Sequence, residues 1–554
     1  MLKKLLSLFA DHSPGRPDSV ISMPQPEAAA LLARAQSEYR QGLLDEAQAH
    51  AEQALAGSHD YAQAHLLLGL VHWRQRRLED AADCFVLAAC FDPALAEAQF
   101  HLGTLAHQRG DTDEAGRCFG KALEVRPGYV EALLSLGKLK FERGEFDAAY
   151  GHFQQAAEAD PNNAFAHSNI GYLLLKRYER AQDALHAVDR AIKLAPQLAE
   201  ARCNRGMVLQ NLGRFEEAVA EYERALELAP GMAEAQVNRA LARLAMGDFA
   251  AGWREYEARR NVHLSLQRPF PYPEWDGTSL AGRTVLVYAE QGLGDEIMFA
   301  SCLPEIIGQA GHCVIECHCK LEKLYARSFP TATVIGADQA SRDLSWLARA
   351  PAVNCRIAVG SLPLHLRRSR EEFPPPAGYL KADPGRIGHW RKRLAGLGTG
   401  INVGLSWRGG TLDTDRINRS LSLPDLLPLL GVAGTRFVSL QYTDCRAEIA
   451  ALQDAHGVQV HRWQEAIDDY DETAALVSAL DLVITVQTAV AHLGGALGKP
   501  VWVMVSAAPG WRYLRSGDTL PWYSSLRVFR QHALGEWQPL IDRVAAELRA
   551  IAKT

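Results

Sequence analysis

EALLSLGKLKFERGEFDAAYGHFQQAAEADPNN, from Glu131 to Asn163, is the stretch that decides the fold of the first half of the chain. It predicts two antiparallel helices. Small residues such as Gly137 and Ala149 allow the two helices to approach closely. Pro161 ends the second helix, because a proline has no N–H for the next helical hydrogen bond.

The same landmarks return along the chain at intervals of 34 or 35 residues. This period is seen in the prolines Pro93, Pro127, Pro161, Pro196 and Pro230 and in the glycines Gly69, Gly103, Gly137, Gly171 and Gly206. A 34-residue unit of this kind is typical of the tetratricopeptide repeat. We therefore predict six units from about Glu27 to Gly231, and a seventh, capping unit that ends near Arg260.

Such arrays expose a concave groove that can hold a partner. At one equivalent position of successive units the sequence has His101, Ser135, Asn169, Asn204 and Asn238. Asparagine amides both donate and accept hydrogen bonds, so Asn169, Asn204 and Asn238 are predicted to line an acceptor groove for a protein or peptide. The alternative is that these polar residues only cover an exposed helix face.

The sequence pattern changes after Arg260. Runs rich in β-branched residues, such as TVLVYA (284–289), INVGLSW (401–407) and DLVITV (481–486), alternate with helical segments. This alternation predicts parallel sheets in two doubly wound lobes, with ligands bound outside the carboxyl ends of the strands.

The predicted fold class is an α-solenoid of tetratricopeptide repeats followed by a two-lobed, Rossmann-like α/β region. The predicted divisions are a leader and linker (1–26), the repeat superhelix (27–260), a linker (261–282), an N-terminal lobe (283–373), an inter-lobe linker (374–400) and a C-terminal, nucleotide-sugar-binding lobe (401–554).

The composition narrows the range of function classes. A net charge of −6 gives no basic surplus for nucleic acid, and no apolar run approaches the roughly 18 residues of a membrane span. The ten cysteines are scattered, so we expect reduced thiols and a cytoplasmic protein. Cys313, Cys317 and Cys319 are predicted to be buried in a strand, where a zinc site is harder to form.

Eight motifs in order carry a family resemblance: EQGLGDEIMFA, VGLSWRGG, NRSLSL, FVSLQ, DETAAL, DLVITVQTAVAHLGGALGKPVWV, WRYL and PWYSSLRVFRQ. Together with the repeats they resemble bacterial tetratricopeptide-repeat glycosyltransferases, and about Trp275 to Trp537 resembles the heptosyltransferases of the two-lobed GT-B class. The resemblance implies inverting, metal-independent transfer of a sugar from a nucleotide diphosphate donor to a hydroxyl acceptor. It implies no cofactor besides the nucleotide sugar itself.

EQGLGD supplies the candidate catalytic residue. Gly292 and Gly294 permit a tight turn, and Asp295 follows at the start of a helix. An aspartate at this place is expected from helix capping alone. The resemblance implies that Asp295 is the base that takes the proton of the acceptor hydroxyl.

The second lobe supplies candidate donor-binding residues. Arg408 and Arg419 flank a loop, and guanidinium groups match phosphate oxygens, although both could be solvated loop charges. Gln441, which ends FVSLQ, is predicted to touch sugar or nucleotide. The triplet Asp413-Thr414-Asp415 resembles a metal motif of a different, single-lobed class, and we predict no metal there.

ITVQTAVAHLGGALGKP (Ile484 to Pro500) predicts a strand, a turn and a helix. The turn Gln487-Thr488-Ala489 would present free N–H groups and the positive end of the helix dipole to an anion. Thr488 would cap the helix. His492, one turn later, is predicted to donate to a phosphate or a ribose hydroxyl, or else to be a core histidine.

Three positions depart from the family pattern. Gln487 and Gly510 each stand where an aspartate is usual, and Glu472 replaces the aspartate of DETAAL. These changes keep a second hypothesis open, a non-catalytic tetratricopeptide scaffold with a degenerate transferase domain. A nucleotide-sugar epimerase on the same architecture is a third hypothesis.

Overall fold

The computed structural model describes residues 26–178, 180–262, 268–338, 343–374, 378–410 and 419–553. These residues form two compact units: residues up to Leu173 with His186–Pro196, and Leu174–Leu185 with Gln197 onward. The predicted leader lies outside the described residues except for Pro26. The triplet Asp413-Thr414-Asp415 also lies outside them.

Seven antiparallel helix pairs follow one another from Pro26 to Tyr256, which confirms the predicted repeats. The helices are α2 (Pro26–Gln41), α3 (Leu44–Gly57), α4 (Ala62–Arg74), α5 (Leu78–Phe91), α6 (Ala96–Gln108), α7 (Thr112–Val125), α8 (Val130–Glu142), α9 (Phe146–Ala159), α10 (Ala164–Lys176), α11 (Ala181–Leu194), α12 (Ala199–Asn211), α13 (Phe215–Leu228), α14 (Ala233–Met246) and α15 (Phe249–Tyr256). A short helix, α16 (Arg259–Val262), follows the seventh pair.

The repeated glycine of the first helix makes room for an aromatic ring of the second helix. A Cβ on Gly137 would lie 2.7 Å from a ring carbon of Phe153, and one on Gly206 would lie 2.5 Å from a ring carbon of Tyr222. Gly69 and Gly103 meet Phe85 and Phe119 in the same way. The period in the sequence therefore reflects one packing contact made in each of these repeats.

The turns inside the repeats use a left-handed residue. Gly110, Gly144, Gly213 and Gly247 have φ between 75° and 84°. In the second repeat the equivalent residue is Arg76, with φ 65°. A non-glycine residue is strained in this region of backbone space, so this repeat keeps the turn at a cost in stability.

The first α/β lobe has a four-stranded parallel sheet in the order β3-β2-β1-β4. Its strands are β1 (Thr284–Tyr288), β2 (His312–His318), β3 (Thr333–Ala337) and β4 (Cys355–Ala358), and its α-helices are α17 (Leu293–Phe299), α18 (Leu303–Gln309), α19 (Glu322–Ser328) and α20 (Leu362–Leu366). Leu286, Val314 and Ile335 from three adjacent strands form the core, as their apolar runs predict.

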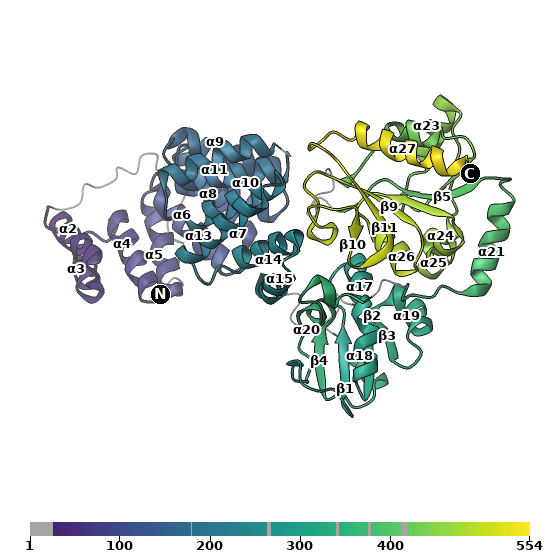
Figure 1. Cartoon of the computed structure of the whole chain (residues 1–554). Coiled ribbons are helices and arrows are strands. Elements are labelled where there is room, and N and C mark those ends of the chain that lie inside the picture. The colour runs from purple at the N-terminus through teal and green to yellow at the C-terminus, as the bar shows by residue number, and fades with distance from the viewer. Residues whose placement is uncertain are drawn as a thin grey trace, which may run out of the picture. The chain divides into compact units, whose positions relative to one another are not determined.

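The second lobe has a seven-stranded sheet in the order β10-β11-β9-β8-β5-β6-β7, parallel except for β10 (Figure 1). The strands are β5 (Ile401–Ser406), β6 (Thr435–Ser439), β7 (Val460–His461), β8 (Leu482–Thr485), β9 (Val501–Val505), β10 (Thr519–Leu520) and β11 (Tyr523–Arg530). The helices are α21 (Pro384–Ala395), α22 (Leu427–Leu430), α23 (Arg446–His456), α24 (Glu465–Asp468), α25 (Tyr470–Ala479), α26 (Ala489–Ala496) and α27 (Gln538–Ala552).

Both predicted linkers are partly structured, and those predictions are wrong to that extent. In the segment 261–282, Phe270 belongs to the core of the first lobe, and Arg268 forms a buried ion pair with Glu316 of β2. The segment 374–400 contains α21, whose buried Trp390 donates to Glu472.

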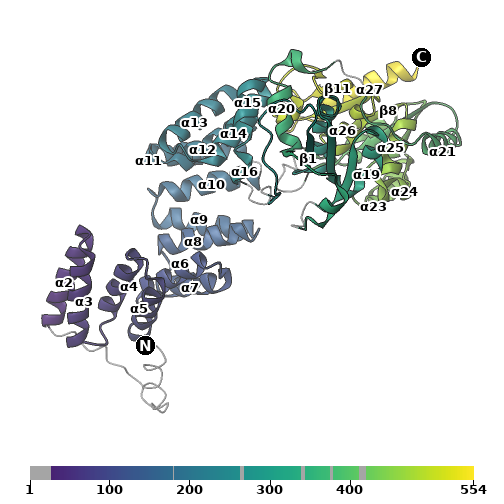
Figure 2. The ribbon, with the colours of Figure 1, turned by 90° about the horizontal axis from the view of Figure 1, so that it is seen from below.

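The boundary predicted at residue 260 is also not a division between compact units. Repeats six and seven share their unit with the α/β lobes, and Figure 2 shows α12 to α15 as neighbouring helices that lead into α16. Trp253 of α15 is buried and donates through its Nε1 to the Arg367 carbonyl at 2.9 Å. The Arg515 N–H donates to the Ala245 carbonyl of α14 at 2.8 Å.

The cysteines of β2 are buried as predicted. Burial raises the pKa of Cys313 to about 12 and that of Cys317 far above its usual range. Cys319 is exposed beyond the end of the strand, so the prediction is wrong for that residue. Across the residues described, no three His, Cys, Asp or Glu side chains are grouped so that they could hold a metal ion. Within the same residues, no helix is long and apolar enough to cross a membrane.

Candidate functional site

The candidate site lies where the strand order of each sheet reverses. In the first lobe β1 lies between β2 and β4, and in the second lobe β5 lies between β6 and β8. The loops after β1, β5 and β8 leave the carboxyl ends of these strands. In doubly wound sheets this is the position at which ligands bind.

The two lobes meet at the start of α17 and the start of α26. A Cβ on Gly294 would lie 3.3 Å from the Ala489 Cα and 3.3 Å from the His492 Cδ2. A glycine at position 294 therefore allows α17 and α26 to approach closely, and its φ is not in the left-handed region. Gly292, by contrast, is the N-cap of α17, and a Cβ there would meet only Asp295 Oδ2, at 3.8 Å.

Asp295 forms an ion pair across the lobes. Its Oδ1 accepts a hydrogen bond from Nε of Arg512, in the 3-10 turn Trp511–Tyr513. The two side chains are 16% and 25% exposed, so a ligand can reach both. Among the described residues the Asp295 carboxylate accepts from Arg512, and no side-chain cap hydrogen bond is formed at the start of α17. This argues against a simple capping role for Asp295.

Gln487 and Gly510, two of the departures from the family pattern, are in contact with each other. Gln487 Oε1 accepts from the Gly510 N–H at 3.2 Å. Gln487 is only 3% exposed, yet among the residues that the structure describes its Nε2 has no hydrogen-bond partner. A buried amide N–H without a partner costs stability, so this group is available for an acceptor atom of a ligand.

Thr488 caps α26, as the sequence predicts. Its Oγ1 accepts from the Val490 N–H at 3.2 Å and pairs with Thr485 Oγ1 at 2.9 Å. The loop after β5 lies against this turn, because a Cβ on Gly409 would come within 2.8 Å of the Gln487 carbonyl oxygen. The loops after β5 and β8 therefore form one surface.

His492 does not present a nitrogen to the site. Its Nδ1 lies 3.1 Å from the Tyr523 hydroxyl and its Nε2 lies 3.3 Å from the Tyr513 hydroxyl. Burial lowers the pKa of His492 to about 4, so the ring is neutral at neutral pH. These contacts favour the second of the two predicted alternatives, a core histidine, and the ring contacts two tyrosine hydroxyls.

Arg408 and Gln441 are also engaged inside the protein. Arg408 Nη1 donates to Glu448 of α23 at 2.5 Å. The Gln441 Oε1 accepts from the Trp407 and Arg408 N–H groups at 3.2 and 3.0 Å, and its Nε2 donates to the Arg408 carbonyl at 3.2 Å. Gln441 is fully buried, so it supports the loop after β5 rather than contacting a donor.

Arg419 stands at the base of the loop whose middle, 411–418, lies outside the described residues. The neighbouring Ser420 pairs with Arg408 in an antiparallel bridge. Burial raises the pKa of Tyr513, and the positive charge of Arg419 opposes part of that rise. Arg419 is therefore close to the Tyr513 that His492 contacts.

The first two residues of EQGLGD are held by the end of the repeat array. Gln291 Oε1 accepts from the Tyr256 hydroxyl of α15 at 2.9 Å. Glu290 is buried in an ion pair with Arg259 of α16, at 2.6 Å. Burial alone would lower the pKa of Arg259, but Glu290 and Glu257 outweigh it and raise that pKa.

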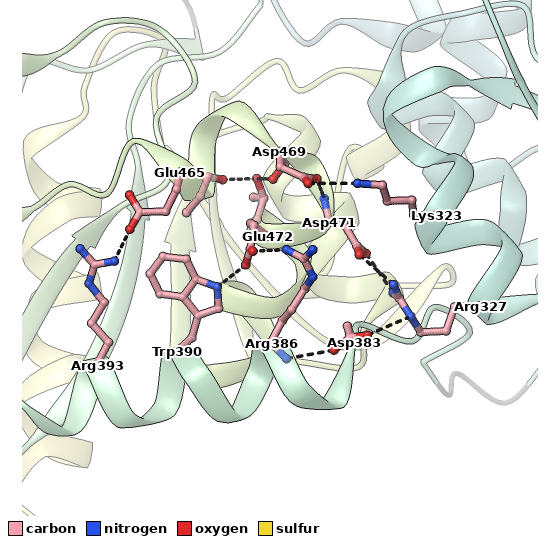
Figure 3. A network of polar contacts seen from close by, with 12 residues as sticks. Lys323, Arg327, Asp383, Arg386, Trp390, Arg393, Glu465, Asp469, Asp471 and Glu472 are labelled. Atoms are coloured by element: carbon pink, nitrogen blue, oxygen red, sulfur yellow. Dashed lines mark hydrogen bonds and ion pairs between the residues drawn. The ribbon is translucent and has the colours of Figure 1, made fainter.

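DETAAL has a structural role, which Figure 3 shows at the start of α25. Glu472 accepts from Arg386 and from Trp390 Nε1 of α21, the latter at 2.8 Å. Asp471 forms a two-point ion pair with Arg327 of α19, at 2.9 and 2.7 Å. The departure at Glu472 therefore affects lobe packing and not the candidate site.

The groove asparagines are only partly available. Asn169 Nδ2 donates to the Phe165 carbonyl of its own helix at 2.8 Å, and Asn238 Nδ2 contacts Cys203 Sγ at 3.8 Å. Asn204 also has a partner within the protein. His101 is packed between aromatic rings, 5.1 Å from that of Phe85. Asn169 belongs to one compact unit, and Asn204 and Asn238 belong to the other.

Sequence reasoning missed Arg512, Tyr513, Tyr523, Tyr256, Arg259 and Glu290 as parts of this arrangement. Signals were available in three of the motifs that carry the resemblance: EQGLGDEIMFA contains Glu290, PWYSSLRVFRQ contains Tyr523, and WRYL contains two more of these residues. WRYL contains both Arg512 and Tyr513.

Comparisons with known proteins support the repeats. Family models described as tetratricopeptide repeat match residues 32–98, 106–170 and 173–245. Protein FlbA of Caulobacter vibrioides is 36% identical over 311 residues, which are 53% of this chain and 52% of that protein. The chain thus spans about half the length of this curated relative.

Three solved structures resemble part of the chain. Pseudomonas aeruginosa PilF is 18% identical with a TM-score of 0.35, and covers 38% of this chain and 95% of its own. YrrB, described as a TPR protein with an unusual peptide-binding site, is 20% identical with a TM-score of 0.29. The match covers 33% of this chain and 95% of YrrB. MamA is 27% identical with a TM-score of 0.25, and the match covers 29% of this chain and 93% of MamA. The chain contains tetratricopeptide repeats, which are followed by an α/β region with two largely parallel sheets.

Proposed function

We propose that the chain is an inverting glycosyltransferase of the two-lobed GT-B type. It transfers a sugar from a nucleotide diphosphate donor to a hydroxyl group, without a metal ion. The observation that carries the proposal is the meeting of Asp295, Arg512 and the Gln487 amide, whose Nε2 has no partner among the described residues, beside the N-terminus of α26.

Each group has a task in this reaction. Asp295 takes the proton of the acceptor hydroxyl as its oxygen attacks the anomeric carbon. The bond from that carbon to the diphosphate breaks, and Arg512, Arg419 and the first N–H groups of α26 offset the charge of the leaving diphosphate. Thr488 holds the start of α26 in place through its cap.

Gln487 supplies a donor where the family pattern has a carboxylate. Its Oε1 is fixed by Gly510, which points the remaining Nε2–H at an acceptor oxygen of sugar or phosphate. An amide has no charge at this place, so we expect a donor sugar different from those of proteins with aspartate here.

The acceptor is proposed to be a protein or peptide held by the repeats. The packing of repeats six and seven in the same compact unit as the site supports this proposal. Asn204 of α12 and Asn238 of α14 are the groove residues in that unit. The half-buried position of both asparagines fits a shallow peptide-binding surface.

A donor screen tests the proposed function. Uridine, guanosine and adenosine diphosphates and their sugars are added to the full chain, and a bound compound raises the melting temperature by mass action. Asp295→Asn should keep this binding and lose turnover by roughly 100-fold or more. Glu547→Gln, which changes an exposed acid elsewhere in the lobe, serves as the control. Turnover should also survive a metal chelator.

The ion pair itself favours one other candidate function, a scaffold that binds nucleotides without catalysis. In this structure the Asp295 carboxylate is already engaged by Arg512, as it would be in a protein that binds a nucleotide without using a base. The same screen separates the two candidates, since a scaffold shows melting shifts but no release of nucleoside diphosphate from any nucleotide sugar.

A further inference from the structure

The Asp295–Arg512 pair joins an element of each lobe. Asp295 belongs to α17 of the first lobe, and Arg512 belongs to the turn after β9 of the second. The Arg512 guanidinium lies 4.7 Å from the centre of the Trp511 ring. Trp511 in turn packs against Trp253 of α15, with 5.4 Å between ring centres. The arginine is thus held on an aromatic platform.

The two partners have competing uses. A guanidinium is the side chain best matched to phosphate oxygens, and a diphosphate carries more negative charge than one carboxylate. A base that accepts a hydrogen bond from an arginine has part of its proton-accepting capacity occupied. While the pair is closed, neither residue is fully available for transfer.

We propose that Arg512 exchanges partners when the donor binds. It leaves Asp295 for the diphosphate, and only then is Asp295 free to take the acceptor proton. The proposal rests on the transferase function proposed above and adds the order in which substrates bind, donor first and acceptor second.

The charges around the pair fit this exchange. Burial lowers the pKa of Arg512, but Asp295 and Tyr256 outweigh it and raise that pKa, so the guanidinium stays charged. Arg419, which like Arg512 acts on Tyr513 through its positive charge, adds positive charge for a diphosphate. The Gln487 amide contacts Gly510, two residues before Arg512, and offers a neutral donor to the same ligand.

The test is a double-mutant cycle on binding of inorganic pyrophosphate to the full chain, measured by calorimetry. Asp295→Asn removes the competing carboxylate and should tighten binding by about tenfold, which corresponds to 1.4 kcal/mol. Arg512→Gln should weaken binding by about tenfold or more, because a charge-assisted hydrogen bond is lost. In the Arg512→Gln background, Asp295→Asn should change binding by less than about twofold.

Controls separate exchange from simple repulsion and from misfolding. Glu216→Gln removes one exposed negative charge of the same unit and should leave pyrophosphate binding unchanged. Arg512→Lys keeps the charge and should retain part of the affinity if Arg512→Gln merely fails to fold. The exchange is overturned if Asp295→Asn tightens binding equally in both backgrounds, if it has no effect, or if pyrophosphate binds to none of the proteins.

Failure of the exchange and failure of the proposed function give different results. If pyrophosphate binds as expected but no nucleotide sugar is turned over, the proposed transferase function is wrong and the exchange of partners still holds. If a nucleotide sugar is turned over but the two substitutions have additive effects on pyrophosphate binding, the transferase function holds and the exchange of partners is wrong.

Discussion

Arg259→Met tests whether the end of the repeat array holds the EQGLGD loop in place. Arg259 and Glu290 are 3% and 1% exposed, and Arg259 donates to Glu290 Oε1 from Nε at 3.1 Å and from Nη2 at 2.6 Å. It also donates to Ser361 Oγ at 2.8 Å and to Glu257 at 2.7 Å. Methionine keeps much of the volume and removes every one of these bonds.

The expected loss follows from the buried carboxylate. Among the described residues Glu290 Oε2 has no hydrogen-bond partner, so removing Arg259 leaves a buried carboxylate without its counter-ion and with only the long hydrogen bond from Gln291 Nε2. Breaking such a pair typically costs about 3–5 kcal/mol. Replacing both residues, as Arg259→Met with Glu290→Met, leaves no unpaired charge and should recover most of the loss.

Urea unfolding followed by tryptophan fluorescence measures this loss. All the tryptophans except Trp73 lie in the unit that contains the pair, so the signal reports on that unit. Arg446→Met, which breaks an exposed ion pair with Asp444, is the control and should leave the midpoint unchanged. A loss below about 1 kcal/mol for Arg259→Met, or a double variant no more stable than the single one, would refute the reasoning.

Three further predictions concern the rest of the chain. Arg76→Gly relieves the left-handed backbone in repeat two and should stabilise the first unit by about 1 kcal/mol, measured by circular dichroism, and destabilisation would contradict this. Gly294→Val should cost about 1–3 kcal/mol of stability and loosen the lobe contact, seen as faster hydrogen exchange in α26, whereas unchanged exchange would count against a tight approach. Because the folded pKa of His492 lies below the usual 6.5, its stabilisation is present above pH 6.5 and is lost as the pH falls towards 4, by about 3 kcal/mol relative to His492→Gln. If the stability of the original protein and of His492→Gln changed with pH in parallel, His492 would make no such contribution.

Local features of the sequence predicted most of the fold. The 34-residue period arises from contacts within one repeat, such as Gly137 against Phe153, so it is visible as a pattern. The strands β1, β8 and β9 are short apolar runs that are buried along almost their whole length. β11 was missed as a strand because its buried and exposed residues alternate irregularly.

The site was predicted less completely, because its contacts join distant parts of the chain. Asp295 and Arg512 are 217 residues apart, and no local pattern connects them. The spacing of Thr488 and His492 placed both on one helix face, but it could not reveal that Tyr513 and Tyr523 occupy both ring nitrogens. The linker composition of 261–282 likewise concealed the ion pair of Arg268 with Glu316.

Hydrogen exchange of the full chain, with and without the nucleoside diphosphate that binds best, tests the central claim most directly. The account predicts protection in three segments that are distant in sequence and adjacent in space: 289–296, 486–493 and 509–513. Protection confined to the repeats, or none at all with a saturating ligand, would contradict a nucleotide diphosphate site at Asp295, Gln487 and Arg512.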